Sequence, residues 1–223
     1  MADPRRARLP CPRVGRDDVA RTLLVGANVH PRRRDILWPI AAGQHGFVSA
    51  RQVLDRGITR GALNQLVHRG TLEQAAFGVY RFPSYPVSRA DPYMLAVLWT
   101  RAPEAALSHE TALDLFEVSD VNPDVIHVTV GRSRRLRRRA AVPYSIHLDD
   151  LAAPQLTWWE EVPITTLSAA IRQCIDVGTP TYLLRQAIDN GDAQGRLTNA
   201  QRDQLTAQLN ERASATPPAQ GDI

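Results

Sequence analysis

Arginine and amide side chains recur on one short stretch of the sequence, residues 59–69. An arginine can hold guanine through two hydrogen bonds, and an asparagine or glutamine can do the same for adenine. A threonine before a helix can cap it, and the helix N-terminus can then hold a phosphate group. The candidate DNA contacts, with the flanking arginines, are Arg51, Thr59, Arg60, Asn64, Gln65, His68, Arg69 and Arg81. The alternative is an ordinary surface helix, whose exposed face is polar in any case.

A second concentration of arginine follows a strand-like run. It consists of Arg132, Arg134, Arg135, Arg137, Arg138 and Arg139. Because no aromatic residue lies inside this cluster, base stacking is not indicated, whereas contact with phosphate groups or with an acidic partner is. The alternative, which the sequence leaves equally open, is a solvated hairpin tip.

Two further patterns could do catalytic or metal chemistry, and both are set aside. Ser108-His109-Glu110 resembles a nucleophile beside a base, but no glycine-rich elbow surrounds the serine, which is explained as a helix cap. His109, His127 and His147 could be metal ligands, but His127 and His147 alternate with apolar residues as outward side chains of strands. We therefore expect no catalytic residue, no bound metal and no cofactor.

The chain contains no lysine, since all 27 basic residues are arginine. This absence excludes enzymes that need a phosphate-binding P-loop lysine, a Schiff-base lysine or the lysine of a metal-dependent nuclease core. The cysteines are Cys11 and Cys174, too few for a disulfide framework, a cysteine-rich zinc site or an iron–sulfur cluster. Cys174 is expected to be a small buried apolar residue.

Charge is distributed unevenly along the 223 residues. Residues 1–90 hold 15 arginines and 6 acids, whereas residues 141–223 hold 5 arginines and 10 acids. A basic N-terminal part and an acidic C-terminal part indicate two roles, and contact with a polyanion is expected of the N-terminal part. We find no apolar run long enough to span a membrane and no convincing signal peptide, so a cytoplasmic protein is expected.

The first predicted domain has the element order of a winged helix-turn-helix. Helices are expected at 35–42, 50–55 and 60–69, followed by strands at 72–75 and 79–82. Pro39 predicts a short or kinked first helix. Ser49 and Gln52 fit a capping box before the second helix, and Gly57 supplies the left-handed residue that ends it.

A mixed α/β domain is predicted after a proline-rich linker. Its expected elements are helices from 93, 109, 167, 180 and 199, and two strands, 125–130 and 144–148, the second with Tyr144, Ile146 and Leu148 inward. The predicted organisation is a disordered basic extension (1–34), the winged helix-turn-helix domain (35–82), a linker (83–92), the α/β domain (93–212) and a disordered tail (213–223).

Three segments resemble the AbiEi-type antitoxins of type IV toxin–antitoxin systems. GFVSARQVLDRGITRGALNQLVHRGTLEQAAFGVYRF (Gly46–Phe82) resembles their winged-helix domain. ALSHETALDLFEVSDVNPDVIHVTV (Ala106–Val130) and VPITTLSAAIRQCID (Val162–Asp176), with the basic run between them, are similar to their second domain. The resemblance extends over about residues 35 to 190, and the arginine-only composition favours a mycobacterial or actinobacterial member.

The resemblance implies an antitoxin that is not an enzyme. In that family the N-terminal domain represses the shared promoter by binding inverted repeats of double-stranded operator DNA, and the second domain counteracts a nucleotidyltransferase-like toxin. The resemblance implies that the predicted contacts within residues 59–69 read the operator DNA. It also implies that the second domain carries the antitoxin effect. The resemblance leaves open whether toxin and antitoxin touch.

Two other functions remain open at this point. One is a plain transcriptional regulator whose second domain binds a ligand or partner. The other is a DNA-binding domain joined to a nuclease-like enzyme, against which the missing lysine argues. Since no coiled-coil heptads are present, a monomer on each half-site is as plausible as a dimer.

Overall fold

The computed structural model of the chain describes residues 32–135 and 144–215. Over these residues the fold is mixed α/β, as the sequence predicts, and its strands form a three-stranded and a five-stranded sheet. Most of the predicted N-terminal extension, residues 1–31, and residues 216–223 of the predicted tail lie outside the described residues. Within the described ranges, no helix combines the length and the apolar character needed to cross a bilayer.

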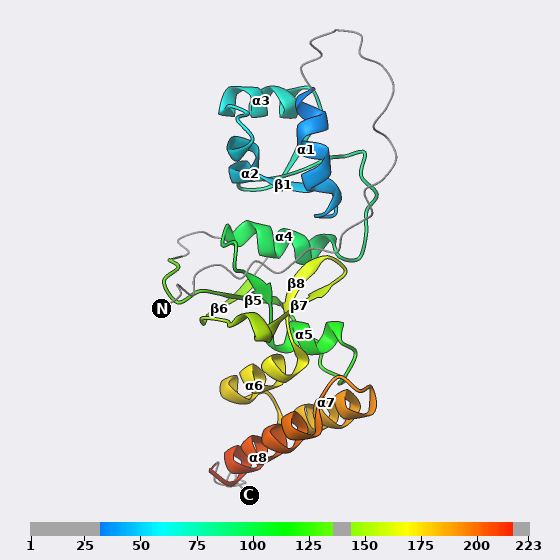
Figure 1. Cartoon of the computed structure of the whole chain (residues 1–223), viewed down its shortest axis with the longest axis vertical. Helices are drawn as coiled ribbons and strands as arrows, with labels where there is room; N and C mark the ends of the chain where they lie inside the picture. The colour runs from blue at the N-terminus through cyan, green and yellow to red at the C-terminus, as the bar shows by residue number, and fades with distance from the viewer. Residues whose placement is uncertain (1–31, 136–143, 216–223) are drawn as a thin grey trace, which may run out of the picture. The chain divides into compact units, whose positions relative to one another are not determined.

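Residues 33–81 form three helices and a small antiparallel sheet (Figure 1). The elements are α1 (Arg33–Ala42), β1 (Phe47–Ser49), α2 (Ala50–Asp55), α3 (Arg60–His68), β2 (Glu73–Ala76) and β3 (Val79–Arg81). β3 lies in the middle of the sheet, between β1 and β2. α1 begins two residues before the predicted helix and keeps Pro39 inside its ten residues. The order of elements is that of the predicted winged helix-turn-helix.

Local sequence signals build the turn between α2 and α3. The predicted capping box is present: Ser49 Oγ accepts the Gln52 N–H at 3.2 Å, and Gln52 Oε1 accepts the Ser49 N–H at 2.8 Å. Gly57 has a φ of +75°, which glycine adopts without strain. Thr59 Oγ1 accepts the Ala62 N–H and caps α3. These contacts fix the residue at which α3 begins.

One apolar core holds α3 against α1, α2 and the sheet. Its buried members are Leu37, Ala41, Val48, Val53, Ile58, Ala62, Leu63, Leu66, Leu72 and Phe82. The α3 members repeat at intervals of three and four residues, so they occupy one side of the helix. The opposite side of α3 is left exposed.

The remaining elements build a larger α/β unit. They are α4 (Asp91–Thr100), β4 (Ala106–Leu107), α5 (His109–Leu115), β5 (Ile126–Val130), β6 (Tyr144–Leu148), a short 3-10 helix (Ala153–Gln155), β7 (Leu156–Trp159), β8 (Val162–Thr165), α6 (Leu167–Val177), α7 (Thr181–Ala193) and α8 (Asn199–Ala215). The sequence did not predict β4, β7 or β8. α8 continues to Ala215, although the tail was predicted to begin at 213.

The two strands predicted around the basic run are parallel neighbours. The sheet order is β6-β5-β4-β8-β7, and His127 of β5 pairs with Ser145 of β6 in parallel register. The possibility that the basic run forms a hairpin tip is therefore wrong, because a hairpin joins antiparallel strands. Parallel strands need a connection of about a dozen residues or more, and residues 131–143 supply it.

α4 and α5 cover opposite faces of this sheet (Figure 1). On the α4 face, Tyr144 meets Trp99 edge-on at 5.3 Å between ring centroids. The prediction that Leu148 points inward is wrong, because its side chain is 53% exposed at the end of the edge strand β6. Cys174 of α6 is fully buried, as predicted.

Candidate DNA-binding surface

The exposed side of α3 carries the predicted polar side chains. Arg60, Asn64, Gln65, His68 and the C-cap residue Arg69 are all exposed. Arg60 and Asn64 lie at the edge of α3 toward the β2–β3 hairpin, where they line a common hollow. Gln65 lies toward α1, where its Oε1 accepts a hydrogen bond from Arg33 at 3.4 Å. The structure therefore gathers these side chains on one surface that is not engaged by the core.

The hollow beside α3 has a volume of about 520 Å³ and is bounded by α2, α3 and the β2–β3 hairpin. Arg51 lines it from α2, together with Gln74 and Tyr80 from the strands. Arg51 is an exposed side chain 3.9 Å from Asp55, and exposed pairs of this kind contribute little free energy. Arg51 can therefore turn to a phosphate group at low cost.

Arg101 is a residue of this surface that sequence reasoning missed. It follows α4, lines the same hollow, and places its guanidinium carbon 4.9 Å from the ring centroid of Phe77 on the β2–β3 turn. Phe77 itself is 65% exposed. No local pattern could have indicated Arg101, because it comes twenty residues after the hairpin and reaches it only through the tertiary fold.

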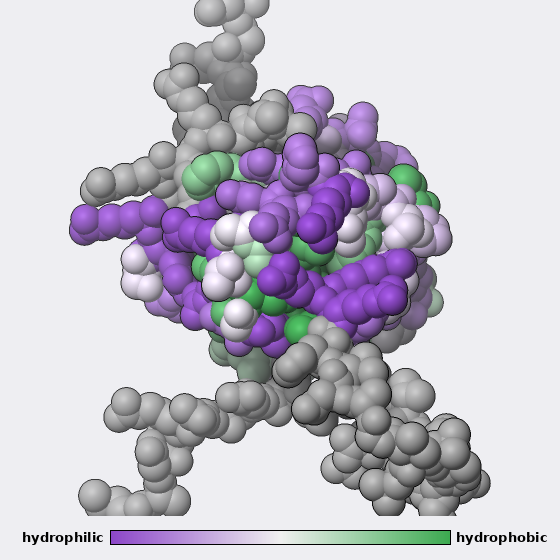
Figure 2. Space-filling model, turned by 90° about the horizontal axis from the view of Figure 1, so that it is seen from above, coloured by the Kyte–Doolittle hydropathy of each residue, from purple (hydrophilic) through white to green (hydrophobic). Residues whose placement is uncertain are grey.

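Hydrophilic side chains cover most of the end of the described chain that carries α1, α2 and α3 (Figure 2). Apolar groups show only in small areas between them. A surface of this kind, with exposed arginines and amides on a helix, suits contact with the phosphates and base edges of DNA.

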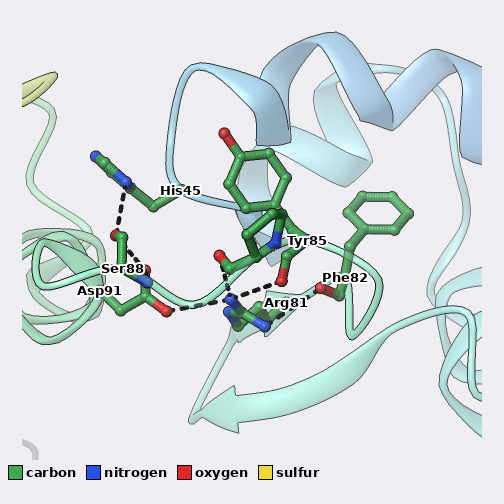
Figure 3. Close-up of polar contacts among 7 residues, drawn as sticks. His45, Arg81, Phe82, Tyr85, Ser88 and Asp91 are labelled. Atoms are coloured by element: carbon green, nitrogen blue, oxygen red, sulfur yellow. Dashed lines mark hydrogen bonds and ion pairs between the residues drawn. The ribbon is translucent and has the colours of Figure 1, made fainter.

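Arg81 does not belong to this surface, which corrects the sequence-based expectation. Its side chain is 9% exposed, and its Nη2 donates to Asp91 Oδ2 at 3.1 Å and to the carbonyls of Tyr85 and Pro86, both at 3.0 Å (Figure 3). Its guanidinium also lies over the Phe47 ring. A buried guanidinium with these partners cannot reach a DNA duplex without breaking the contact between β3 and α4.

The basic run lies in the α/β unit that begins with α4, called the second unit below, and aspartate and glutamate side chains neutralise part of its charge. Arg132 bonds Asp149 at 2.8 Å, and Arg134 forms two hydrogen bonds with Glu104, at 2.6 and 2.7 Å. The Arg134 guanidinium holds the pKa of Glu104 below its usual value. Arg135 is exposed. Arg137, Arg138 and Arg139 lie outside the described residues.

The three histidines that the sequence analysis set aside come together in space. His109 begins α5, and His127 and His147 lie on the face of β5 and β6 that α5 covers. The rings of His109 and His147 stack with 3.5 Å between centroids. The interpretation of Ser108 as a side-chain cap is wrong, because its Oγ instead lies 3.0 Å from His109 Nδ1 and accepts a hydrogen bond from Thr129.

Residues 37–83 match a family described as transcriptional regulators, AbiEi antitoxins. This match confirms the resemblance to AbiEi-type antitoxins over the part of the chain that it covers, which includes α2, α3 and the β2–β3 hairpin. Among solved structures, the chain is similar to that of the RV2827C protein from Mycobacterium tuberculosis, with 19% identity and a TM-score of 0.49, over 80% of this chain and 73% of that chain. Comparison with curated proteins gave no match.

Proposed function

We propose that this protein is a DNA-binding antitoxin that represses its own operon and counteracts a nucleotidyltransferase-like toxin. One observation carries the DNA-binding part of the proposal. The segment that matches the AbiEi antitoxin regulators folds as a winged helix-turn-helix, and its α3 exposes arginine and amide side chains while its apolar side is buried.

On operator DNA, α3 would lie in the major groove, as the recognition helix of such domains does. Arg60 and Arg69 are the proposed guanine contacts, and Asn64 or Gln65 the proposed adenine contact. Arg51 and the Thr59 hydroxyl would hold phosphates beside the groove, because α2 and the N-terminus of α3 flank it. Arg101 replaces Arg81 as the proposed arginine beside the hairpin.

The antitoxin effect is assigned to the unit that begins with α4. Its similarity to the second domain of AbiEi-type antitoxins supports this assignment, and its acidic balance separates it from the basic DNA-binding part. The exposed Arg135 is a proposed contact to phosphate or to the toxin. The proposal includes no enzymatic step. Because the proposed ligand is promoter DNA, the proposed site of action is the cytoplasm.

The experiment is a fluorescence-anisotropy titration of the DNA upstream of this protein's own gene against a scrambled duplex at several salt concentrations. We expect tight, sequence-selective binding that weakens steeply with salt. The double variant Arg60→Ala/Arg69→Ala removes two proposed base contacts, each contributing about 1–3 kcal/mol, so its affinity for the operator should fall at least about thirty-fold. Affinity for the scrambled duplex should fall less.

The matched control is Arg172→Ala/Arg185→Ala, which removes the same charge from α6 and α7. It should leave operator affinity within about two-fold of wild type, since Arg172 is half-buried, Arg185 is exposed, and both charges lie far from α3 and are largely screened. Both variants should still restore growth when the toxin is co-expressed, because the antitoxin effect is assigned to the second unit. Equal losses in the two double variants, or equal binding to both duplexes, would contradict the proposed recognition by α3.

A further inference from the structure

The histidine cluster joins three separate elements of the second unit. His109, His127 and His147 come from α5, β5 and β6, and one ring nitrogen from each lies within 4.8 Å of those from the other two. His127 and His147 are brought to one face by the parallel register, in which His127 pairs with Ser145 and Thr129 pairs with His147. None of the three lies in the segment that matches the antitoxin family.

The cluster carries nitrogen lone pairs rather than charge at neutral pH. Burial, followed by the neighbouring histidines, lowers the pKa of His109 to about 3. Burial likewise lowers the pKa of His147 to about 4 and moves that of His127 downward. A metal ion binds neutral imidazole through a ring nitrogen lone pair.

The hydrogen bonds around the rings leave nitrogens directed at one another. His109 Nδ1 lies 3.0 Å from Ser108 Oγ, which leaves Nε2 as its nitrogen for a ligand. Such a contact from the second nitrogen orients histidine ligands in metal sites. His127 Nδ1 and His147 Nε2 lie 3.0 Å apart, which for two neutral rings is a hydrogen bond with the proton on one of the two nitrogens. The Ser145 hydroxyl also lies 3.2 Å from His147 Nε2, so a metal ion at this nitrogen would replace that contact as well.

We propose that His109, His127 and His147 bind one divalent transition metal ion, with Zn²⁺ as the first choice. Three imidazoles with a fourth position left to water or a small anion are a known ligand set for Zn²⁺. With Zn–N bonds of about 2.1 Å, two nitrogens on a tetrahedral ion lie about 3.4 Å apart, so His127 and His147 need separate only slightly. The metal would take the place of their shared proton and tie α5 to β5 and β6.

The ring of His109 must turn for this to occur. A metal ion lies in the plane of each imidazole that holds it, whereas the rings of His109 and His147 now stack with an 18° angle between their planes. His127 and His147 are only half-buried, which gives an ion access to their rings, whereas His109 is 4% exposed and its ring must turn inside the core.

The test is titration of the full-length, tag-free chain with Zn²⁺ by calorimetry and with Co²⁺ by visible absorption, Mg²⁺ serving as the comparison ion. We expect one tight equivalent of Zn²⁺, a four-coordinate Co²⁺ spectrum, a higher melting temperature with Zn²⁺, and none of these with Mg²⁺. His147→Gln should weaken Zn²⁺ binding at least about ten-fold. The control His68→Gln, in the exposed part of α3, should bind like wild type.

A measurement on the wild-type protein guards against a variant that fails to fold. X-ray absorption at the zinc edge of the loaded chain should show scattering from three imidazole rings. The proposal would be overturned by equal Zn²⁺ affinity in the two glutamine variants or by binding only at millimolar Zn²⁺. It would also be overturned by an absorption spectrum that shows fewer than three imidazole rings bound to the zinc.

Discussion

The role of each arginine is decided by the carboxylates and carbonyls within its reach. Arg81 and Arg60 look alike in sequence, since each lies among polar neighbours in the winged helix-turn-helix. In the fold, Arg81 meets Asp91 and two backbone carbonyls in a buried place, whereas Arg60 is exposed beside an open hollow. Asp91 lies ten residues later in the chain, so only the tertiary structure shows that Arg81 is used internally.

The buried histidines should make folding sensitive to acid. The pKa of His109 falls from 6.5 to about 3 on folding, so between these values the unfolded chain binds a proton that the folded chain does not. Stability is therefore lost as pH falls below 6.5, by up to about 1.4 kcal/mol per pH unit for His109 alone. Urea unfolding in EDTA at pH 7, 6 and 5 measures this slope.

Replacing His147 tests the origin of that slope. His147→Gln removes a second ring whose pKa falls on folding, to about 4, so stability should depend less steeply on pH than in wild type. His68→Gln, which changes an exposed side chain, should leave the slope unaltered. A slope that is the same in all three proteins would show that other groups control acid unfolding.

At the scale of elements, the features that depend on local sequence signals were predicted, whereas the strands that depend on non-local pairing were not. The capping box at Ser49 and Gln52 and the glycine at 57 depend on residues within a few positions, and the structure confirms both. β4 has two residues and β8 pairs with it in parallel from far along the chain, so neither shows a pattern of its own. The three histidines were named as possible metal ligands and then set aside for the same reason, since the parallel register that brings His127 and His147 to one face has no local pattern.

Gly61 gives a prediction about α3 as a recognition helix. A Cβ added there would meet nothing within 4 Å, so the fold does not require glycine at this exposed position. Gly61→Ala should therefore stabilise the helix by up to about 1 kcal/mol. If α3 enters the major groove, the same methyl group sits on the face that approaches DNA, and operator affinity should fall while the melting temperature rises.

Thermal melting and operator anisotropy measured on the Gly61→Ala variant separate these two effects. Ala62, its neighbour, is buried in the core, so the exposed and buried sides of α3 differ by one residue. A rise in stability with unchanged operator affinity would place the DNA on another face of α3.

At the scale of the whole described chain, the DNA-binding part and the second unit share buried contacts. Phe47 and Val79 belong to the same apolar cluster as Ala90 and Met94 at the start of α4. Residues 83–90, predicted as part of a linker, are also held, because the Tyr85 hydroxyl donates to the Ala42 carbonyl and Ser88 bonds Asp91. His45 contacts both Ser88 and the Glu160 carbonyl. The sequence indicated two parts of opposite charge and gave no sign of this coupling.

The Arg81–Asp91 pair should be the main polar determinant of that coupling. Asp91 Oδ2 accepts from Arg81 and Oδ1 accepts from the Ser88 hydroxyl at 2.8 Å, with the Asp91 side chain only 14% exposed. Asp91→Ala leaves the Arg81 charge buried and unpaired, which typically costs about 3–5 kcal/mol. We therefore expect the winged helix-turn-helix of this variant to unfold at lower denaturant than the second unit.

Tryptophan positions allow the two parts to be followed separately. Trp38 lies in α1 and reports on the DNA-binding part. In a variant that keeps Trp38 as its single tryptophan, with Trp99, Trp158 and Trp159 changed to Phe, the fluorescence transition follows the unfolding of that part. This transition is compared with the circular dichroism transition, which follows all helices. The control Asp203→Ala breaks an exposed pair with Arg202 and should cost less than about 1 kcal/mol. If Asp91→Ala destabilises no more than Asp203→Ala and its two transitions coincide, the buried pair does not couple the parts, and the apolar contact of Phe47 and Val79 with α4 must do so.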